Sequence, residues 1–424
     1  MMYLSRIAKE AVLWRTLRYP EMRKLGLRTL VGMRPFLAHE KVTRVGDKVM
    51  FNSFLPPFPS EAFRTLARGI GELKRGKATP ISTYVAVTNK CRFNCWHCSR
   101  THRCGKDMLR DELVRVIGEL QKLGVSIVGI TGGEPLLRTD LEDLVESVDE
   151  RSVTILFTSG DGLTAGRAAS LRRSGLFGVA ISLDHYEAEI HDKRRGKKGA
   201  YATAIEAVRT ARSAGFYTMI QLVATRDLAN EDVLDRYLSL ASQLGVHEIR
   251  LLEPMPTGEL TGEQCACCIN GEQRELLKRI HRKTNGDRSS PKVTSFAHIE
   301  HGSMYGCGAG FQHMYIDSSG NVCPCDFTPI SFGNVLEKPV AAVWRRMQEA
   351  FGQPGRVCFL LRNAAKLGAM FEGKLPLDYE DIRSTCKFPH DEELPGYYKM
   401  LGWTGAAKSH RAERALRREP AWGC

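Results

Sequence analysis

Between residues 82 and 252, short apolar runs rich in β-branched residues alternate with segments in which apolar residues recur at helical spacing. The short runs predict six strands, at residues 83–88, 127–131, 153–158, 179–183, 218–224 and 248–252. The helical spacing predicts helices at residues 110–123, 141–148, 165–173, 201–214 and 231–244. Strands that alternate with helices form a parallel sheet, so the sequence predicts an α/β fold with its reactive groups at the carboxyl ends of the strands.

The first 36 residues follow another pattern, in which apolar and basic residues share helical segments. Over residues 1–18 the apolar positions at helical spacing are Leu4, Ile7, Ala11, Trp14 and Leu17. Pro20 ends this segment, and a second apolar and basic stretch follows it. Two interpretations are open: residues 1–36 bind an anionic membrane surface, or they form ordinary helices packed against the main domain.

After about residue 260 the alternation of strands and helices is lost. Residues 261–390 are rich in Cys and Gly, with a short strand signal at 313–316, and they predict a smaller domain that is not held by a large core. The last 20 residues read as a basic helix or a loose tail. The expected organisation is therefore a basic N-terminal segment with a connector (1–80), an α/β core (81–260), a Cys-rich domain (261–390) and a basic tail (391–424).

Composition excludes several classes of protein. The chain has 424 residues, of which 43% are hydrophobic and 26% charged, so it is not broadly disordered. It contains no apolar run long enough to span a bilayer and no secretion signal, which predicts a cytoplasmic protein. The net charge is +13, and residues 1–50 hold 11 Lys and Arg against 4 Asp and Glu. Thirteen cysteines in such a chain indicate metal or redox chemistry rather than disulfides.

The strongest chemical signal follows directly after the first predicted strand. Cys91, Cys95 and Cys98 form a C-x3-C-x2-C motif, in which three thiolates can hold one face of a metal cluster. A 4Fe–4S cluster takes one cysteine per iron, so three cysteines leave one iron open to a substrate or cofactor. The alternative is a zinc site, which needs a fourth ligand such as Cys104 or His102.

Gly132, Gly133, Glu134 and Pro135 lie at the end of the second predicted strand. With the cysteine motif at the end of the first strand, this segment resembles the radical S-adenosylmethionine (radical SAM) superfamily. The resemblance implies a partial (β/α)6 TIM-like barrel, a 4Fe–4S cluster with one open iron, and S-adenosylmethionine as cofactor. It also implies that the Gly-Gly-Glu segment binds the amino group of the methionine moiety, with the Glu134 carboxylate as the partner of that ammonium.

Three further segments at predicted strand ends strengthen the resemblance. They are Thr158-Ser159-Gly160, Ser182-Leu183-Asp184 and the stretch from His191-Asp192 to Arg195-Gly196. The resemblance implies that they contribute further cofactor-binding residues: Thr158, Ser182, Asp184 and Arg195.

A second group of cysteines resembles the SPASM or shorter twitch extension, which carries auxiliary iron–sulfur clusters in this superfamily. The matching pattern is Cys307-x12-Gly320-x4-Cys325. The resemblance implies one auxiliary cluster bound by Cys307 and Cys325, with the remaining ligands drawn from Cys323, Cys358 and Cys386, and two clusters as the alternative. The cysteines at 265, 267 and 268 either bind a further iron or form a reactive pair, and Cys104 and Cys424 are expected to be free thiols.

The implied activity is reductive cleavage of S-adenosylmethionine to a 5′-deoxyadenosyl radical, which abstracts hydrogen from an unactivated carbon. A one-electron reductant such as ferredoxin or flavodoxin is the implied partner. A lipid-like or other non-peptide substrate is expected, since residues 1–80 do not read as a leader-binding domain; a peptide substrate is the alternative. A non-catalytic iron–sulfur protein for electron transfer or nucleic-acid binding is the competing class, and an aromatic content of only 8% argues against nucleic acid.

Overall fold

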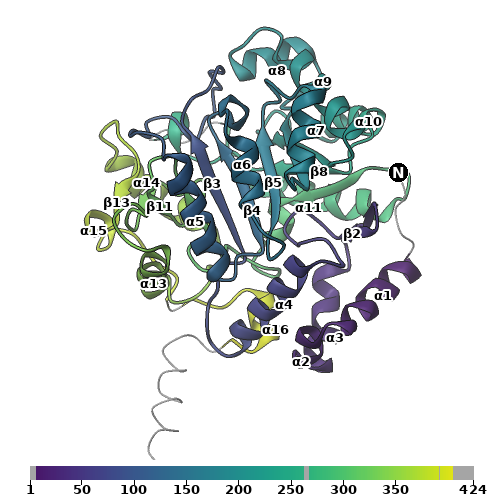
Figure 1. The fold of residues 1–424 in the computed structure, drawn as a ribbon, viewed down its shortest axis with the longest axis vertical. Helices are drawn as coiled ribbons and strands as arrows, with labels where there is room; N and C mark the ends of the chain where they lie inside the picture. The colour runs from purple at the N-terminus through teal and green to yellow at the C-terminus, as the bar shows by residue number, and fades with distance from the viewer. Residues whose placement is uncertain (1–5, 262–266, 391, 404–424) are drawn as a thin grey trace, which may run out of the picture.

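The computed structural model describes residues 6–261, 267–390 and 392–403 (Figure 1). Cys265, Cys424 and the basic tail at 405–424, for which a helix or a loose tail was expected, lie outside the described residues. For residues 6–9 the structure describes only the backbone.

A nine-stranded sheet, parallel except for one edge strand, forms the centre of the molecule (Figure 1). Its order is β11-β10-β3-β4-β5-β6-β7-β8-β9, so strands β3 to β9 follow one another in space as they do in sequence. The strands are β3 (Ser82–Thr88), β4 (Ile127–Gly132), β5 (Val153–Thr158), β6 (Gly178–Ser182), β7 (Tyr217–Val223), β8 (Glu248–Leu252), β9 (Lys292–Ser295), β10 (His313–Ile316) and β11 (Val322–Cys323). Only β11 is antiparallel to its neighbour.

The six predicted strands correspond to β3–β8, and their sequential parallel order is that of a partial barrel. In the described residues β9 and β11 do not pair with each other, so the barrel stays open. The α/β prediction is confirmed.

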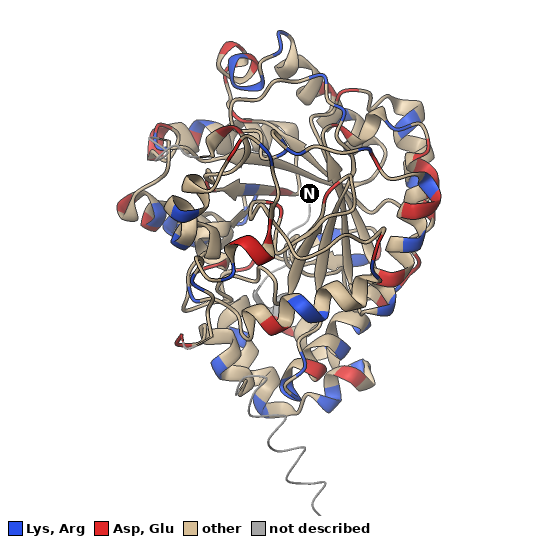
Figure 2. Cartoon of the chain, turned by 90° about the vertical axis from the view of Figure 1, so that its left-hand side faces the viewer, with Lys and Arg blue, Asp and Glu red and all other residues tan. Residues whose placement is uncertain are grey.

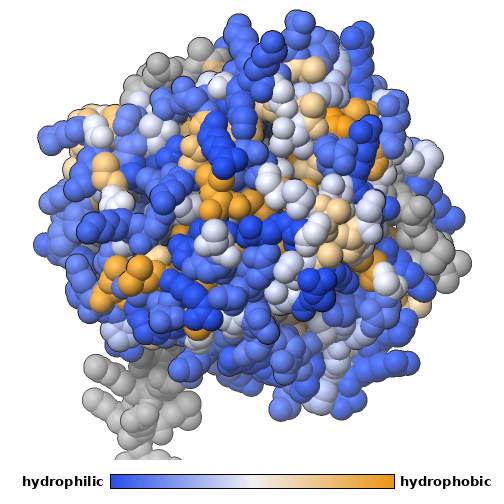
Figure 3. Space-filling view, turned by 45° about the horizontal axis from the view of Figure 1, so that its top comes forward, coloured by the Kyte–Doolittle hydropathy of each residue, from blue (hydrophilic) through white to orange (hydrophobic). Residues whose placement is uncertain are grey.

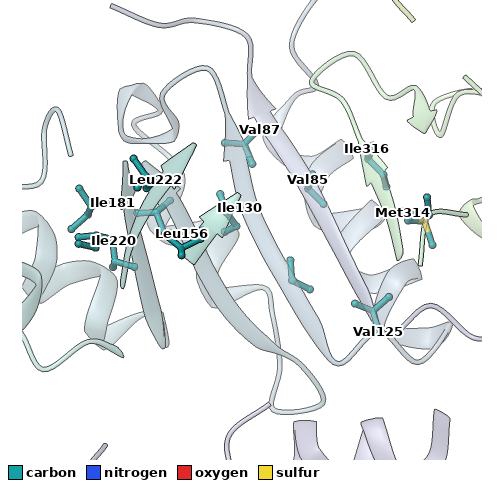
Figure 4. Packing of buried hydrophobic residues seen from close by; sticks show 14 of the residues in the cluster. Val85, Val87, Val125, Ile130, Leu156, Ile181, Ile220, Leu222, Met314 and Ile316 are labelled. Carbon is teal, nitrogen blue, oxygen red and sulfur yellow. The ribbon is translucent and has the colours of Figure 1, made fainter. Parts of the chain in front are cut away.

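Helices cover the outer face of the sheet and bury its apolar side chains. They are α5 (Arg110–Lys122), α6 (Leu141–Glu146), α7 (Ala165–Arg173), α9 (Ala200–Ser213), α10 (Glu231–Leu244) and α11 (Gly271–Gly286), with the short α8 (Ala188–Arg195) after β6. Val85, Ile130, Leu156, Ile181 and Ile220 project from successive strands into this core and are at most 1% exposed (Figure 4). The α8 helix was not predicted, because its charged sequence lacks an apolar face.

The N-terminal segment is helical and packs against the rest of the chain. It comprises α1 (Arg6–Arg15), a 3-10 turn (Thr16–Arg18), α2 (Pro20–Lys24), α3 (Leu27–Leu37), the hairpin β1 (Thr43–Val45) and β2 (Lys48–Met50), and α4 (Glu61–Lys74). Together with α16 (Gly396–Leu401), these helices lie below the sheet (Figure 1). Met22, Leu25 and Phe36 are buried in a common core with Leu66 and Ile70 of α4. The structure therefore agrees with the second interpretation of this segment, in which the helices pack against the main domain. This agreement concerns the face of the helices that is buried.

The Cys-rich region shares the core of the main sheet, contrary to the expectation of a domain without a large core. Strand β10 pairs in parallel with β3, and α13 (Val340–Phe351) buries Trp344, Met347 and Phe351 in the same cluster as the barrel residues. The remaining elements are α14 (Phe359–Ala369) and the short α12 (Phe296–Ile299), β12 (Ile330–Ser331), β13 (Leu377–Asp378) and α15 (Tyr379–Ile382). The short elements, of two to four residues, carry too few positions to show a periodicity, so the sequence revealed little of how this region joins the core.

The surface is that of a typical globular protein. Positive and negative side chains are interspersed, and Lys and Arg recur along the helices at the lower end of the molecule (Figure 2). The face seen in Figure 3 is mostly hydrophilic, with apolar side chains in a few separate groups. Among the described residues, no helix combines the length and the apolar character needed to cross a membrane.

Candidate functional site

The three cysteines of the first motif line one cavity at the carboxyl ends of β3–β8. They lie on the loop after β3, and Asp107 holds the start of this loop. Its carboxylate accepts hydrogen bonds from the hydroxyl of Thr88 at 2.6 Å and from the backbone N–H of Asn89 at 2.7 Å. Near the cysteines the backbone N–H of Asn94 donates to the carbonyl of Arg195, which ties the loop to the end of α8.

The thiols of Cys91, Cys95 and Cys98 fit a cluster that leaves one iron open. They are the only described cysteines that line this cavity, and burial raises the pKa of Cys91 and of Cys95. A zinc site would need a fourth ligand, but the thiol of Cys104 is exposed and the ring of His102 packs on Phe371. Neither residue lines the cavity, so the geometry favours the iron–sulfur interpretation.

Gly132 and Gly133 allow the end of β4 to lie against the cysteine loop. A Cβ atom on Gly133 would stand 2.2 Å from the carbonyl oxygen of Lys90, and one on Gly132 would stand 2.3 Å from that of Thr88. Those two carbonyls accept hydrogen bonds of 2.8 Å from the backbone N–H groups of Glu134 and Gly133, respectively. The glycines are required here because backbone meets backbone just before Cys91.

The carboxylate of Glu134 is fully buried and does not line the cavity. One oxygen accepts from the hydroxyl of Thr158 at 2.6 Å and from the backbone N–H of Leu136 at 3.1 Å. The other accepts from the backbone N–H and the hydroxyl of Ser159. Glu134 therefore joins the end of β4 to the end of β5, and the structure does not place its carboxylate as the direct partner of a ligand's ammonium.

Asp184 and Arg195 form a buried ion pair beside Cys95. Arg195 Nε lies 2.7 Å from Asp184 Oδ2, and Arg195 Nη1 lies 3.6 Å from the sulfur of Cys95. Although burial alone would raise it, the pKa of Asp184 is lowered by the guanidinium of Arg195. His97 Nε2 stands 3.8 Å from the same carboxylate, and burial lowers the pKa of His97 to about 4, so its ring is neutral at physiological pH. The guanidinium of Arg195 therefore lies next to the thiol of Cys95.

A second cavity adjoins the first, and we call it the chamber. Its volume is ≈ 240 Å³, and its walls come from the N-terminal helices, α4, the loop after β8 and the Cys-rich region. Most side chains that line it are apolar, among them Leu30, Phe63 and Phe296. The two cavities share five residues: Tyr84, Leu252, Phe296, Asp326 and Phe327. The two cavities therefore adjoin across a common wall.

Three cysteines of the Cys-rich region line the chamber: Cys307, Cys325 and Cys358. The thiol of Cys307 is hydrogen-bonded to Cys358, which lowers the pKa of Cys307 to about 7. A backbone hydrogen bond of 2.8 Å from Cys307 to Gly355 brings the two segments together. The sulfur of Cys325 lies 3.1 Å from the hydroxyl oxygen of Thr328. The structure thus places three soft donors, Cys307, Cys325 and Cys358, among the residues that line the chamber.

Comparison with known sequences agrees with these two sites. The sequence model of the radical SAM superfamily matches residues 85–238, and that of an iron–sulfur cluster-binding domain, SPASM, matches residues 307–363. The mycofactocin maturase MftC of Mycolicibacterium smegmatis is 32% identical over 288 residues, which cover 63% of this chain and 71% of the relative. This chain belongs to the radical SAM superfamily. An AdoMet-dependent heme synthase of Methanosarcina barkeri is 26% identical, covering 62% of this chain and 81% of the relative.

Solved structures share the fold of this radical SAM chain. Streptococcus suis SuiB bound to the precursor peptide SuiA superposes with a TM-score of 0.53, covering 66% of this chain and 68% of SuiB, at 17% identity. The structure of anSMEcpe with bound AdoMet covers 80% of this chain and all of its own, with a TM-score of 0.50 at 16% identity. At these identities the likeness concerns the fold alone.

The protein is therefore a radical SAM enzyme with a SPASM domain. Such enzymes use a 4Fe–4S cluster and S-adenosylmethionine, and the SPASM domain binds auxiliary iron–sulfur clusters. When bound, the 4Fe–4S cluster and S-adenosylmethionine would together supply one-electron radical chemistry at this site. This chain contributes the three thiols of the first motif, a cavity at the strand ends and the buried Asp184–Arg195 pair beside Cys95.

Six of the eight residues expected to bind S-adenosylmethionine line the cavity together with the cysteines. They are Gly132, Gly133, Thr158, Ser182, Asp184 and Arg195. Glu134 and Pro135 are buried behind them and do not line it. The expected segment is thus at the site, but the Glu134 side chain positions β4 and β5 instead of facing the cavity.

Two of the candidate auxiliary ligands lie away from the chamber. Cys323 is fully buried, and its sulfur lies 3.5 Å from Arg103 Nη1, next to Asp317. Cys386 follows α15, is buried and lines neither cavity. Of the three further candidates, Cys358 therefore lines the chamber with Cys307 and Cys325, whereas Cys323 and Cys386 do not. Cys268 is half-buried near Pro254.

Tyr84 and Arg250 are among the cavity-lining residues that sequence reasoning missed. Both lie inside strands, on β3 and β8, and point into the barrel. The signal was present for Arg250, because a charged residue in the middle of the apolar strand Glu248–Leu252 is costly to bury without a role. Tyr84 gave no such signal, since a tyrosine suits any half-buried strand.

Proposed function

We propose that this enzyme abstracts hydrogen from an apolar part of a peptide held in the chamber, which lies between the radical SAM cavity and the SPASM thiols. The observation that carries the proposal is that the two cavities adjoin, with Tyr84, Phe296 and Asp326 in the walls of both. A substrate that fills the chamber has one end beside the cofactor cavity and its flank beside Cys307 and Cys358. An auxiliary cluster held by these thiols would lie beside such a substrate and would supply an acceptor for its electron.

Two comparisons support a peptide substrate over the lipid-like substrate expected from the sequence. The mycofactocin maturase is more similar in sequence to this chain than the heme synthase is, and the match covers most of its length. SuiB, which shares the fold, was solved with its precursor peptide. The heme synthases show that relatives of this chain also act on other substrates, but their sequence identity to this chain is lower than that of the maturase.

A lipid-like substrate is the second candidate, and the N-terminal helices favour it. Trp14, Leu27 and Val31 line the chamber and are 52%, 63% and 48% exposed. Exposed arginines lie on the same helices, including Arg15, which directly follows Trp14, and Arg28 next to Leu27. Exposed apolar side chains among cations suit a surface of anionic lipids, from which a lipid could pass directly into the chamber.

Vesicle flotation with the cluster-loaded full-length enzyme tests the lipid candidate. The probes are vesicles of phosphatidylcholine alone and vesicles with added phosphatidylglycerol. If lipid is the substrate, the wild type floats with the anionic vesicles, and the double variant Trp14→Ser/Leu27→Ser does not. Leu109→Ser is the matched control, since Leu109 is 69% exposed but lines neither cavity. No flotation of the wild type removes this candidate and leaves the peptide.

The peptide proposal is tested by product analysis. The enzyme, S-adenosylmethionine and dithionite are incubated under anaerobic conditions with a library of apolar peptides, and mass spectrometry follows both the peptides and 5′-deoxyadenosine. Peptides that lose hydrogen or gain a cross-link, in step with 5′-deoxyadenosine, support the proposal. Modification of molecules in a lipid extract instead, with all peptides unchanged, contradicts it.

A further inference from the structure

We infer that Arg250 binds an oxyanion of the substrate, a carboxylate or a phosphate, and thereby anchors an apolar substrate at the junction of the two cavities. The inference rests on the proposed function for the identity of the reaction cavity. It adds a feature that the proposed function does not contain, a required negative charge on the substrate.

Arg250 is a buried cation with free donors. It is 1% exposed and lines the radical SAM cavity. Its Nη2 donates to the hydroxyl of Tyr84 at 3.3 Å, whereas Nε and Nη1 have no hydrogen-bond partner within the described part of the chain. In that part of the chain, no carboxylate oxygen lies within 4 Å of the guanidinium. An arginine in this state has lost its hydration without gaining a counter-ion.

Aromatic rings surround the guanidinium without supplying acceptors for its N–H groups. The guanidinium carbon lies 4.8 Å from the ring centre of Phe157, 5.3 Å from that of Phe296 and 5.8 Å from that of Phe54. Each cation–π contact stabilises the charge and offsets part of the cost of burial. The rings also hold the side chain in place, so its free N–H groups keep a fixed direction.

The carboxyl groups nearby do not neutralise Arg250. Burial raises the pKa of Glu300 well above its ordinary value, which favours the uncharged acid. Asp326 is engaged elsewhere, since its Oδ1 lies 3.4 Å from Nε2 of His313. The charge of Arg250 therefore remains available to a ligand, and two free N–H donors on one guanidinium suit a carboxylate or phosphate.

Tyr84 places this anion site at the entrance to the chamber. Its ring lines both cavities, and its hydroxyl accepts from Arg250 while keeping its own proton to donate. Burial raises the pKa of Tyr84, so that proton is retained. Phe54 and Phe296 belong to the wall of the chamber as well as to the ring of aromatics around Arg250. An oxyanion at Arg250 therefore leaves the apolar body of the same molecule in the chamber.

Calorimetric titration of the anaerobic, cluster-loaded enzyme tests this inference with probes of equal chain length. Decanoate and decyl phosphate carry the two oxyanions, and decanol carries none. We expect both anions to bind the wild type more tightly than decanol, and the stronger of the two identifies the oxyanion. In Arg250→Gln the anions should bind roughly 10- to 100-fold more weakly, with decanol unchanged. Arg250→Lys, which keeps the charge, should retain part of the preference.

Arg103→Gln is the matched control, because Arg103 is also buried but contacts Cys323 and lines neither cavity. It should keep the preference for anions. Equal binding of all three probes by the wild type, or no binding of any, overturns the inference even if Arg250→Gln does not fold. Weaker binding of S-adenosylmethionine itself by Arg250→Lys also overturns it, since Arg250 would then serve the cofactor. Failure of the wild type to cleave S-adenosylmethionine would defeat the proposed function and leave the binding result standing.

Discussion

Glu134 illustrates how one side chain sets the position of two strands. Its carboxylate accepts four hydrogen bonds, from Thr158, from Leu136 and twice from Ser159, all at the carboxyl end of β4 or β5. The backbone of Gly132 and Gly133 faces the cavity in its place. A buried acceptor of this kind is expensive to remove, because its donors are left without partners.

We predict that Glu134→Ala lowers the free energy of unfolding by about 1–3 kcal/mol and weakens binding of S-adenosylmethionine through the displaced strand ends. Thermal unfolding and equilibrium dialysis, run on the same preparation, measure the two effects. An unchanged melting temperature together with lost binding would contradict this role. It would indicate that the carboxylate contacts the cofactor directly.

The SPASM cysteines differ in what surrounds each sulfur. Cys358 lies against Cys307 and lines the chamber. Cys386 is buried elsewhere, and the charged group that acts on its thiol is Lys366. We predict that Cys358→Ser loses about four irons per chain relative to the wild type, and that Cys386→Ser loses none. Iron analysis after anaerobic reconstitution measures both. Equal loss in the two variants would place Cys386 in the cluster and refute the ligand set drawn from the structure.

At this scale the sequence predicted the residues whose role depends on local spacing. Cys91, Cys95 and Cys98 act within one loop, so their motif is legible without the fold. The role of Glu134 depends on β5 lying beside β4, and the difference between Cys358 and Cys386 depends on which segment reaches Cys307. Spacing along the chain contains neither contact.

Among the elements, strand β9 is held to the N-terminal hairpin by buried charge. Lys292 of β9 donates to the carbonyl of Met50 at 3.0 Å and to the hydroxyl of Tyr217 at 2.9 Å. That hydroxyl donates to Glu248, whose other oxygen accepts from Ser53. The network joins the first residues of β7, β8 and β9 to Met50 and Ser53, at the end of the sheet opposite the site.

This network makes stability depend on pH in a specific direction. Burial lowers the pKa of Lys292 to about 8, from 10.5. Between these two values the folded state has released a proton that the unfolded state still holds, so the free energy of unfolding rises with pH, by up to about 3 kcal/mol. Below pH 8 both states are protonated and this contribution is constant.

We predict that the melting temperature of the wild type, relative to Lys292→Met, increases from pH 8 to pH 10. Differential scanning fluorimetry of the two proteins across this range gives the difference directly. Lys122→Met is the control, because Lys122 is exposed and its loss should leave the pH dependence of the wild type intact. A flat difference between wild type and Lys292→Met would contradict a depressed pKa.

The elements that were predicted correctly are those long enough to show a period. Strands β3–β8 and helices α5, α7, α9 and α10 lie within a few residues of the expected bounds. Strand β9 and helix α8 were missed, the first because four residues show no alternation and the second because it is charged throughout. Helix α4 was missed although Ser60 caps it, because residues 1–80 were expected to form only a basic N-terminal segment and a connector.

Across the whole molecule, the N-terminal segment and the SPASM domain close the open barrel from two sides. Residues far apart in sequence, such as Leu30, Phe63 and Cys307, line one chamber beside the radical SAM cavity. The sequence predicted each part but not the chamber, because its walls come from segments whose mutual positions no local pattern encodes. Deleting residues 1–36 would remove Met22 and Phe36 and uncover Leu66 and Ile70 of α4, which are buried with them, so point variants are the cleaner probe of the surface.

The most direct test of the central claim is anaerobic incubation of the reconstituted enzyme with S-adenosylmethionine and dithionite, with 5′-deoxyadenosine measured by mass spectrometry. Cys95→Ala runs beside it, because this variant removes one of the three thiols that hold the cluster. We predict 5′-deoxyadenosine from the wild type and none from Cys95→Ala. Product from Cys95→Ala, or none from an iron-loaded wild type even when a native cell extract supplies substrate, would contradict radical chemistry at this site.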